Sequence, residues 1–450
     1  MSSSLPERLR AIVGAAHVVT DADVLDGRSV DHTGRYRGKA SALVRPGSAL
    51  EVAAVLRECR DAGVSVTVQG GRTSLVAGTV PEHDDVLLST ERLTEIGEVD
   101  VVERRIRVGA GVTAAAVQRA AAGAGLLFGV DLAARDSATV GGMASTNAGG
   151  LRTVRYGNMG EQVIGLDVAL PDGSLVHRHS MVRSDNTGYD LASLFIGAEG
   201  TLGVITGLDL RLHPVPAHRV TAVCGFAELD ALVSAGRVLR DTESIAALEL
   251  IDGRAAALAA EHLDVPVPTA GAWLLLIELA GETDLTERLA EALEDAELSG
   301  EPAVGIDATA QQRLWQVREA TAEVVGLFGP PLKFDVSLPL SAIPAFAAAS
   351  AALVAAHAPD AIPVLFGHIG EGNLHLNVLR CDAEQEAQLY AAMMTLIADH
   401  GGNVSSEHGV GSRKRHYLSM ARTDEDIAAM RTIKAAFDPT GYLNPAVLFD

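Results

Sequence analysis

Two glycine-rich windows near the end of the chain concentrate side chains that bind metal ions and move protons. Residues 367–377 contain two histidines, and residues 406–409 read Ser-Glu-His-Gly. Imidazole and carboxylate groups are common ligands of divalent metals, and a further imidazole beside them can accept a proton. The N-terminal half has a different pattern, namely glycine-rich turns typical of loops that hold a phosphorylated cofactor. A metal site and cofactor loops in one chain predict redox catalysis.

The first window is expected to form a hairpin. Residues 364–369 and 374–379 each read as a strand, with a Glu-Gly-Asn turn between them. Residues two apart in a strand share a face, so His375 and Asn377 point the same way, and the turn predicts that His368 lies opposite His375.

Glu407 then needs one loop to complete an open three-ligand site. Two imidazoles and a carboxylate suit Zn²⁺, with Mn²⁺ as the second choice, and leave room for substrate oxygens. The alternative is that these histidines are structural. For one histidine alone that is the better interpretation, but two histidines together with Glu407 and His408 favour a metal site.

Length and charge limit the classes of function. A chain of 450 residues predicts two or three domains. A net charge of −22 argues against nucleic acid or anionic lipid as a partner. The one tight basic cluster, residues 413–416, is interpreted as a solvated turn. No apolar run reaches about 18 residues, so no transmembrane helix is expected, and the first residues lack a signal-peptide pattern.

Cysteine usage indicates a reducing compartment. The three cysteines, Cys59, Cys224 and Cys381, are far apart and show no Cys-x-x-Cys spacing. Neither a disulfide framework nor an iron–sulfur cluster is expected. We therefore expect a cytoplasmic protein whose electrons leave through another carrier.

Hydrophobic periodicity predicts a mixture of helices and strands, with a boundary at Pro214-Val215-Pro216. Ser48 and Glu51 form a capping-box pattern at the start of a helix that Gly63 ends. The other predicted helices are 113–122, 283–298, 310–327, 341–357 and 384–400, and the other predicted strands are 64–68, 101–102, 106–108, 273–279 and 333–338. Strand–helix alternation with a hairpin favours an α+β domain after the boundary.

Three segments of the N-terminal half avoid bulky side chains: residues 69–78, 139–150 and 196–206. Glycines let backbone N–H groups converge on an anion, and the Thr and Ser residues add hydroxyl donors. A single such loop is as well explained by a plain turn, but three indicate a long ligand lying along the backbone. Neither GxGxxG nor GxxxxGK[ST] is present, which argues against a Rossmann site or a P-loop.

These three segments resemble the FAD-binding domain of the vanillyl-alcohol-oxidase-type (PCMH-type) flavoproteins. The C-terminal windows resemble the partner domain of the FAD-linked 2-hydroxyacid dehydrogenases, the group of D-2-hydroxyglutarate dehydrogenase, D-lactate dehydrogenase and the glycolate oxidase flavin subunit. The resemblance extends from about Asp31 to Phe449. Residues 69–81, residues 185–191 and the spacing of His368, His375 and Glu407 look most like the hydroxyglutarate/lactate branch.

The resemblance implies an α+β fold in three parts. Residues 1–215 would form a two-subdomain, PCMH-type FAD-binding domain. Residues 216–435 would form an α+β substrate- and metal-binding cap domain with an antiparallel sheet. Residues 436–450 would be a C-terminal tail that returns to the flavin.

The resemblance also implies which residues hold FAD. The binding would be non-covalent, because the first loop contains neither His nor Cys. The implied FAD-binding residues are Gly70, Gly71, Arg72, Thr73, Ser74, Gly78, Ser137, Gly142, Thr146, Asn147, Gly200, Ile205 and Asn444.

The same resemblance assigns roles in the C-terminal half. His368, His375 and Glu407 would be the metal ligands, and His408 would be the catalytic base beside them and a substrate contact. Arg318 and Lys333 would grip the substrate carboxylate, with Asn377 as a further substrate-binding residue. From the residues alone, Arg318 is better explained as a surface ion pair with a helical glutamate.

The expected reaction is oxidation of a D-2-hydroxy acid to its 2-oxo acid, with hydride transfer to flavin N5. An external acceptor would then take the electrons: a quinone, a cytochrome, an electron-transfer flavoprotein or an iron–sulfur subunit. The alternatives are a glycolate oxidase-type flavin subunit, a non-redox transferase of the ether-lipid synthase type, and a metal-binding or regulatory protein without activity. The acid, the acceptor, the metal and the oligomeric state, a homodimer included, are left open.

Overall fold

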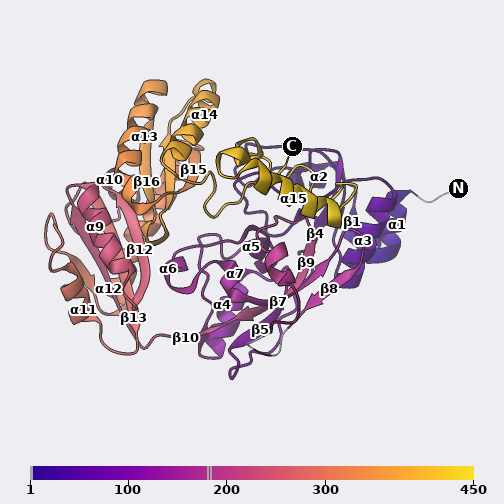
Figure 1. Cartoon of the computed structure of the whole chain (residues 1–450), viewed down its shortest axis with the longest axis horizontal. Coiled ribbons are helices and arrows are strands. Elements are labelled where there is room, and N and C mark those ends of the chain that lie inside the picture. Colours follow the sequence, from indigo (N-terminus) through magenta and orange to yellow (C-terminus); the bar gives the residue numbers. More distant parts are fainter. Residues whose placement is uncertain (1–3, 180–181, 183–184, 450) are drawn as a thin grey trace. The chain divides into compact units, whose positions relative to one another are not determined.

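The chain forms two compact units in the computed structural model, which describes residues 4–179, 182 and 185–449. The first unit comprises residues up to 150, 156–215 and 407–450, and the second comprises 151–155 and 216–406. Figure 1 labels their elements along the sequence. The segment from Glu407 onward thus belongs to the first unit, whereas the predicted tail starts at residue 436. The predicted domain limits remain predictions.

The first unit contains a small mostly parallel sheet. Its strand order is β1 (Val18–Val19), β2 (Ala40–Val44), β4 (Asp85–Ser89) and β3 (Val66–Gln69), with β1 antiparallel to β2 and the rest parallel. The accompanying helices are α1 (Leu5–Val13), α2 (Ala22–Arg28) and α3 (Ala49–Asp61). The start of α3 agrees with the predicted cap, because the Ser48 hydroxyl accepts the N–H of Glu51.

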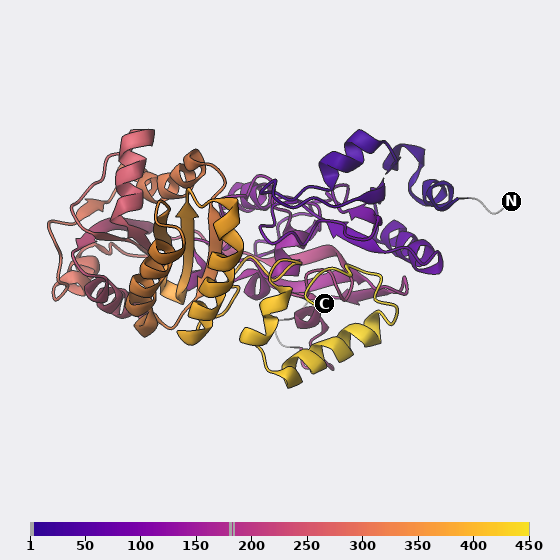
Figure 2. The ribbon, with the colours of Figure 1, turned by 90° about the horizontal axis from the view of Figure 1, so that it is seen from above.

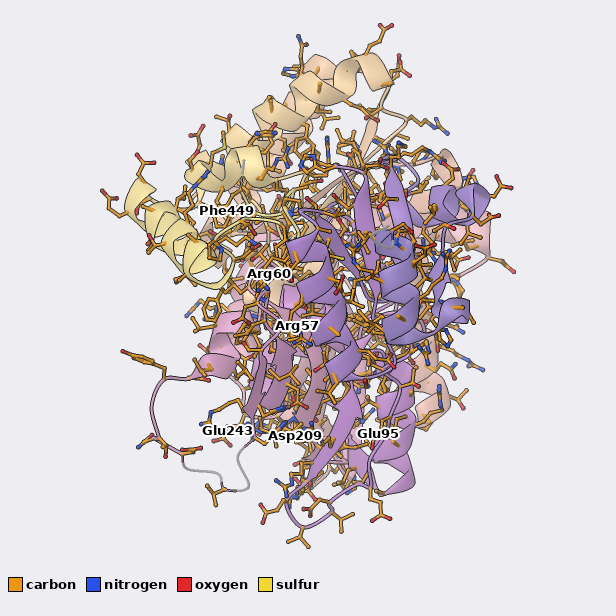
Figure 3. All side chains as sticks on the ribbon, turned by 90° about the vertical axis from the view of Figure 1, so that its right-hand side faces the viewer. Arg57, Arg60, Glu95, Asp209, Glu243 and Phe449 are labelled. Carbon is orange, nitrogen blue, oxygen red and sulfur yellow. The ribbon has the colours of Figure 1, made fainter. Side chains whose placement is uncertain are left out.

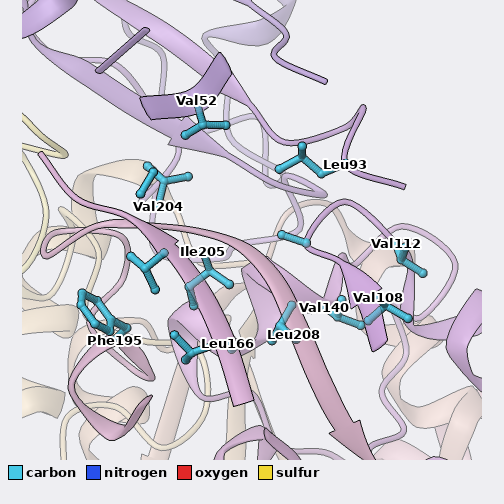
Figure 4. Close-up of a cluster of buried hydrophobic side chains, with 14 of the residues drawn as sticks. Val52, Leu93, Val108, Val112, Val140, Leu166, Phe195, Val204, Ile205 and Leu208 are labelled. Atoms are coloured by element: carbon cyan, nitrogen blue, oxygen red, sulfur yellow. The ribbon is translucent and has the colours of Figure 1, made fainter. Parts of the chain in front are cut away.

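A second, antiparallel sheet completes the two-subdomain arrangement of this unit. Its order is β5 (Arg105–Gly109), β9 (Val204–Arg211), β7 (Val163–Ala169) and β8 (Leu175–Arg178). Alternate residues of these strands, Val108, Leu166 and Leu208 among them, point into one apolar core (Figure 4). The predicted strand at residues 101–102 is wrong: both valines lie exposed in a turn before β5.

The C-terminal segment joins the first sheet as an irregular strand. Leu443 forms a parallel bridge with Val66, and Asn444 donates its backbone N–H to Val66 O at 2.8 Å. The remaining elements of this unit are η1 (Ala15–His17), α4 (Ala114–Gly123), β6 (Leu126–Leu127), α5 (Val140–Thr146), α7 (Met159–Gln162), α8 (Leu191–Phe195), β10 (His213–Pro214), η5 (Arg415–Met420) and α15 (Asp424–Phe437).

The second unit is built on a seven-stranded antiparallel sheet, as expected. Its order is β14 (Ala303–Gly305), β11 (His218–Phe226), β13 (Trp273–Gly281), β12 (Ile245–Asp252), β16 (Ile362–His368), β17 (Asn373–Leu379) and β15 (Leu332–Ser337). In Figures 1 and 2 this sheet and its helices run from magenta to orange.

Helices cover both faces of this sheet. Helices α10 (Gly253–Leu263) and α12 (Ala308–Val324) pack on the face that carries Ile251. Helix α9 (Leu229–Arg240) approaches Leu248 of the other face, and α14 (Ala383–Asp399) stacks Tyr390 on Phe334 there. The other elements are α6 (Thr153–Tyr156), α11 (Thr286–Leu293), η2 (Val325–Phe328), η3 (Leu340–Ala342), α13 (Ile343–His357) and η4 (Ile369–Glu371).

Two helices of the second unit bear on the expectations from sequence. The helix predicted over 283–298 is shorter, although Leu285, Leu289 and Leu293 are buried as its pattern indicates. Among the described residues, the segment Leu340–His357 is the one long and apolar enough, by length and composition, to cross a membrane. Its buried side chains, Ile343, Phe346, Ser350 and Val354, follow one helical face. The expected lack of a transmembrane helix remains a prediction.

Candidate functional site

The first unit contains a pocket of about 290 Å³ at the carboxyl end of β3. It is walled by the loop after β3, by α5 and the residues before it, and by the segment before β9. Glu407, His408 and Asn444 complete the lining. The volume is close to the lower end of the range for small-molecule sites, which is about 300–1,000 Å³.

Most of the predicted cofactor residues line this pocket. They are Gly70, Gly71, Arg72, Thr73, Ser74, Gly78, Gly142, Thr146, Gly200, Ile205 and Asn444. Ser137 and Asn147 do not contribute to the lining. Asn147 ends α5 in the left-handed region, and its Oδ1 accepts the N–H of Gly160 at 2.8 Å. Asn147 thus has a structural partner, and the role of every residue in binding FAD remains a prediction.

The loop after β3 presents a row of available backbone donors. Within the described part of the chain, the N–H groups of residues 71–75 donate to no protein acceptor. Buried or half-buried N–H groups in folded proteins are normally satisfied, so consecutive open donors at a pocket wall indicate an anionic ligand. Arg72 lies in the same row and adds a positive charge.

Glycine is required where two walls of the pocket touch. A Cβ added to Gly71 would lie 2.0 Å from Ser137 O, and one added to Gly200, whose φ is +70°, would lie 2.6 Å from Asn444 Nδ2. Larger residues would force the segments apart. The small-residue runs of the sequence therefore reflect close backbone packing as well as space for a ligand.

Asn444 fastens the C-terminal segment to the pocket wall. Its Oδ1 accepts the N–H of Val68 at 2.8 Å, and its Nδ2 donates to Glu199 O at 2.7 Å. The predicted return of the tail toward the cofactor loops agrees with this position. Together, the open donors and the small-residue walls fit a phosphorylated cofactor such as FAD.

Glu407 and His408 lie in the pocket lining of the first unit. Both side chains are half-buried, and His408 Nε2 lies 3.5 Å from Glu407 Oε1. The chain directly after them is held by Glu199, which accepts the N–H of Val410 and of Gly411 at 2.8 Å each. Burial raises the pKa of Glu199 despite these two donors and the nearby Lys414.

Two features of this segment and its contacts were missed or misread in the sequence. The cluster at 413–416 is not a solvated turn throughout, because Lys414 is buried. Glu199 was not singled out, although it is the only charged residue among the small side chains of 196–206. An ionisable residue in such a run was the available signal.

In the second unit, the hairpin strands present polar side chains on one face. Directly opposite pairs are His375 with Phe366 of β16 and with Asp335 of β15, and Asn377 with Lys333. The predicted placement of His368 directly opposite His375 is therefore wrong by two residues, because the turn that contains η4 begins one position earlier than predicted and pairs His368 with Asn373. The two imidazoles are diagonal neighbours, with ring centroids 5.3 Å apart.

A buried ionic group supports this face. Glu249 of β12 accepts from Arg318 Nε at 2.7 Å and lies 2.6 Å from His368 Nδ1. Burial opposes ionisation of Glu249, but His368 and Arg318 hold the pKa of its carboxyl below the usual value. Arg318 also lies over the ring of Phe366, 4.8 Å from its centroid. The interpretation of Arg318 as a surface ion pair is wrong.

Arg318 keeps part of its guanidinium available. Of its three guanidinium nitrogens, only Nε has a hydrogen-bond acceptor among the described residues, so both Nη groups are open. Lys333 is exposed on the same face of the sheet. A planar guanidinium and an ammonium on one face can bind a carboxylate.

The predicted metal ligands divide between the two units. His368 and His375 are neighbours in the second unit, where Asp335 Oδ1 lies 4.0 Å from His375 Nδ1. Glu407 belongs to the first unit. Imidazole and carboxylate donors fit Zn²⁺ or Mn²⁺. The three-ligand set, the base and the substrate contacts all remain predictions.

Two known protein families match successive parts of the chain. Residues 40–178 match the family described as FAD binding domain, and residues 215–448 match FAD linked oxidases, C-terminal domain. The second match covers more than half of the chain.

Known relatives match almost the whole chain. It is 34% identical to a D-2-hydroxyglutarate dehydrogenase of Stutzerimonas stutzeri, over 99% of both chains. It is 37% identical to a D-2-hydroxyglutarate dehydrogenase of Xanthomonas citri pv. viticola, over 98% of this chain and 96% of the relative. Among solved structures, substrate-bound p-cresol methylhydroxylase superposes with a TM-score of 0.82 at 17% identity, covering 99% and 96% of the two chains, which shows a shared fold.

Proposed function

The chain belongs to the FAD-linked oxidases, in the family that contains the D-2-hydroxyglutarate dehydrogenases, and we propose from this premise that it oxidises a D-2-hydroxy acid to the 2-oxo acid. It is an FAD-linked 2-hydroxyacid dehydrogenase. The proposal concerns the acid, the metal and the residues that act. D-2-Hydroxyglutarate is the first substrate to test, because both bacterial relatives carry that name, and D-lactate is the second.

One observation supports the proposal most strongly. A single face of two adjacent strands, β15 and β17, carries Lys333, His375 and Asn377, and the neighbouring helix α12 adds Arg318, which has open donors on a buried, fixed guanidinium. A 2-hydroxy acid offers a carboxylate and a hydroxyl on adjacent carbons. A guanidinium beside imidazole and amide groups complements that pair of groups.

Cationic side chains bind and orient the carboxylate of the substrate. Arg318 binds it through its Nη groups, while the bond from Nε to Glu249 and the stack on Phe366 fix the plane of the guanidinium. Lys333 adds charge, which offsets the anionic substrate in a protein of net charge −22. Asn377 orients the remaining oxygen.

His408 accepts the hydroxyl proton at an imidazole nitrogen, with Glu407 3.5 Å away to stabilise the imidazolium. Bound FAD supplies the hydride acceptor for the α-hydrogen. A divalent ion held by His368, His375 and Glu407 would supply Lewis acidity toward the hydroxyl. The open N–H groups of residues 71–75 would hold the pyrophosphate of the cofactor.

The external electron acceptor and the compartment belong to the same proposal. Two of the three cysteines are buried, and all three are free thiols. This supports a reducing compartment, which we propose is the cytoplasm. Electrons then leave to a quinone, a cytochrome, an electron-transfer flavoprotein or an iron–sulfur subunit.

The test is an anaerobic panel of D- and L-2-hydroxy acids of different length, followed at the flavin absorbance, with the 2-oxo product identified by chromatography. We expect bleaching by one or more D-acids and slow or no bleaching by their L-enantiomers. Absence of bleaching by every hydroxy acid in flavin-loaded protein would contradict the proposal and favour a non-redox role.

A further inference from the structure

The outer face of the second sheet in the first unit carries a cluster of ligating side chains that the proposed reaction does not use. On β5, β9 and β7, the residues next to the buried Val108, Leu208 and Leu166 point the opposite way. Asp167 and Asp209 are two of these residues. Asp209 is labelled on this sheet in Figure 3.

Strand register brings two histidines to the same place. His177 of β8 is directly opposite Asp167 of β7, and His179, two residues later, continues on the same face. His177 Nδ1 and His179 Nε2 each lie 2.6 Å from Asp167 Oδ1. One ligand atom from each of Asp167, His177 and His179 lies within 4.8 Å of the others.

We propose that Asp167, His177 and His179 form a binding site for a divalent cation of the Zn²⁺ class. Two imidazole nitrogens and one carboxylate oxygen are a donor set that Zn²⁺ prefers, and three protein ligands leave a position for water. The His177 side chain is 58% exposed, so an ion can enter from solvent. This site lies in the first unit and shares no residue with the predicted His368–His375–Glu407 set.

A second carboxylate orients one of the ligands. His179 Nδ1 lies 2.6 Å from Asp209 Oδ2, which leaves Nε2 directed at Asp167. Metal-bound histidines usually donate their other ring N–H to a carboxylate, which fixes the tautomer and raises the basicity of the ligand. Asp209 is fixed in turn by Arg107, whose Nη1 donates to Asp209 Oδ1 at 3.2 Å.

The charge of the cluster also suits a cation, although Arg107 occupies part of the space, with its Nη1 2.9 Å from His179 Nδ1 and 3.1 Å from His179 Nε2. Asp167 and Asp209 carry two negative charges, and Arg107, which contacts both, offsets one. Gly165 and Gly207 keep the backbone clear, because a Cβ would lie 2.9 Å from Asp209 Oδ2 or 3.0 Å from Asp167 Oδ2, respectively.

The experiment measures Zn²⁺ uptake by untagged, flavin-loaded protein that has been stripped with a chelator and titrated against a chromophoric zinc indicator. Each variant is made in the parent and in a His375→Ala background, so that the two sites are counted separately. We expect His177→Ala and Asp167→Asn each to bind one Zn²⁺ fewer than the protein without that substitution, both in the parent and in the His375→Ala background. We expect the exposed control His83→Ala to match the parent.

Asp209→Asn tests the orienting role. It should still bind the ion, with an affinity about 10–100-fold lower, because such outer partners typically contribute that much. Uptake by His177→Ala and Asp167→Asn equal to that of the parent would overturn the proposal. His177 is largely exposed, so His177→Ala is expected to retain its flavin and fold, and the result is decided by that variant if Asp167→Asn does not fold.

Discussion

The carboxylate of Glu199 accepts the backbone N–H of Gly411 at 2.8 Å, although the two residues are 212 positions apart in the chain. The same side chain accepts the N–H of Val410, and its carbonyl oxygen accepts from Asn444. Glu199 thus ties the segment before β9 to the residues that follow His408 and to the C-terminal segment. All of these groups lie in the first unit, around the pocket.

Glu199→Gln should loosen this connection. An amide offers one acceptor oxygen where the carboxylate offers two, so one buried N–H loses its partner and Lys414 loses a nearby charge. We expect the free energy of unfolding to fall by about 1–3 kcal/mol, the cost of an unsatisfied buried polar group. Denaturant unfolding of the flavin-loaded protein measures this change. The exposed Glu95, labelled in Figure 3, provides the control Glu95→Gln, and equal stability of the two variants would contradict the assignment.

His408→Ala should retain flavin and lose reduction by substrate. A positioned general base typically contributes about 10²–10⁴-fold in rate, so the anaerobic rate of flavin bleaching should fall by that factor. Stopped-flow absorbance provides the measurement, and the exposed His416, eight residues later, provides the matched control His416→Ala. An unchanged bleaching rate in His408→Ala would remove the base assignment.

Arg318→Lys keeps a positive charge but loses the planar fork that binds a carboxylate. We expect KM for the acid to rise about tenfold to hundredfold, which corresponds to a lost charge-assisted hydrogen bond of about 1.5–3 kcal/mol. Arg313→Lys, at an exposed position of the same helix, should leave KM unchanged. A normal KM in Arg318→Lys would place the carboxylate elsewhere.

Chelation should distinguish the two proposed cation sites. If His368, His375 and Glu407 hold the catalytic metal, a chelator lowers kcat without releasing flavin, and Zn²⁺ or Mn²⁺ restores it. The His177→Ala protein should show the same loss and recovery, because its site is separate from the reaction. Full activity after complete metal removal, verified by elemental analysis, would refute the metal-assisted step.

Thiol reactivity should separate Cys381 from the other two cysteines. Burial raises the pKa of Cys59 and of Cys224 to about 12, so both remain protonated at pH 8 and shielded. We expect one fast thiol per folded chain with a disulfide reagent, and three after denaturation. Cys381→Ser should abolish the fast phase, and a rapid second equivalent in the folded protein would contradict the burial of Cys59 or Cys224.

The sequence predicted the positions of the strands better than their pairing register. The strands around His375 were expected because their alternation is strong, and β16 and β17 occur at those positions. The partner of His375 was misplaced by two residues, because the turn lies one position earlier than predicted and no local pattern fixes that position. Register of this kind is set by packing against β12 and β15.

The candidate site shows the same limit. The small-residue runs predicted a cofactor pocket, because close backbone approach requires glycine at Gly71 and Gly200. Contacts between distant segments could not be predicted in this way. The link between Glu199 and Gly411 and the burial of Lys414 depend on tertiary pairing.

The most direct test of the central claim is an anaerobic titration of the oxidised, flavin-loaded protein with D-2-hydroxyglutarate and D-lactate, with the flavin spectrum and the 2-oxo acid measured in the same sample. The account predicts that at least one of these D-acids reduces the flavin with one 2-oxo acid formed per flavin reduced, while its L-enantiomer does not. A flavin that stays oxidised with both D-acids, or that is reduced without formation of the 2-oxo acid, would contradict it.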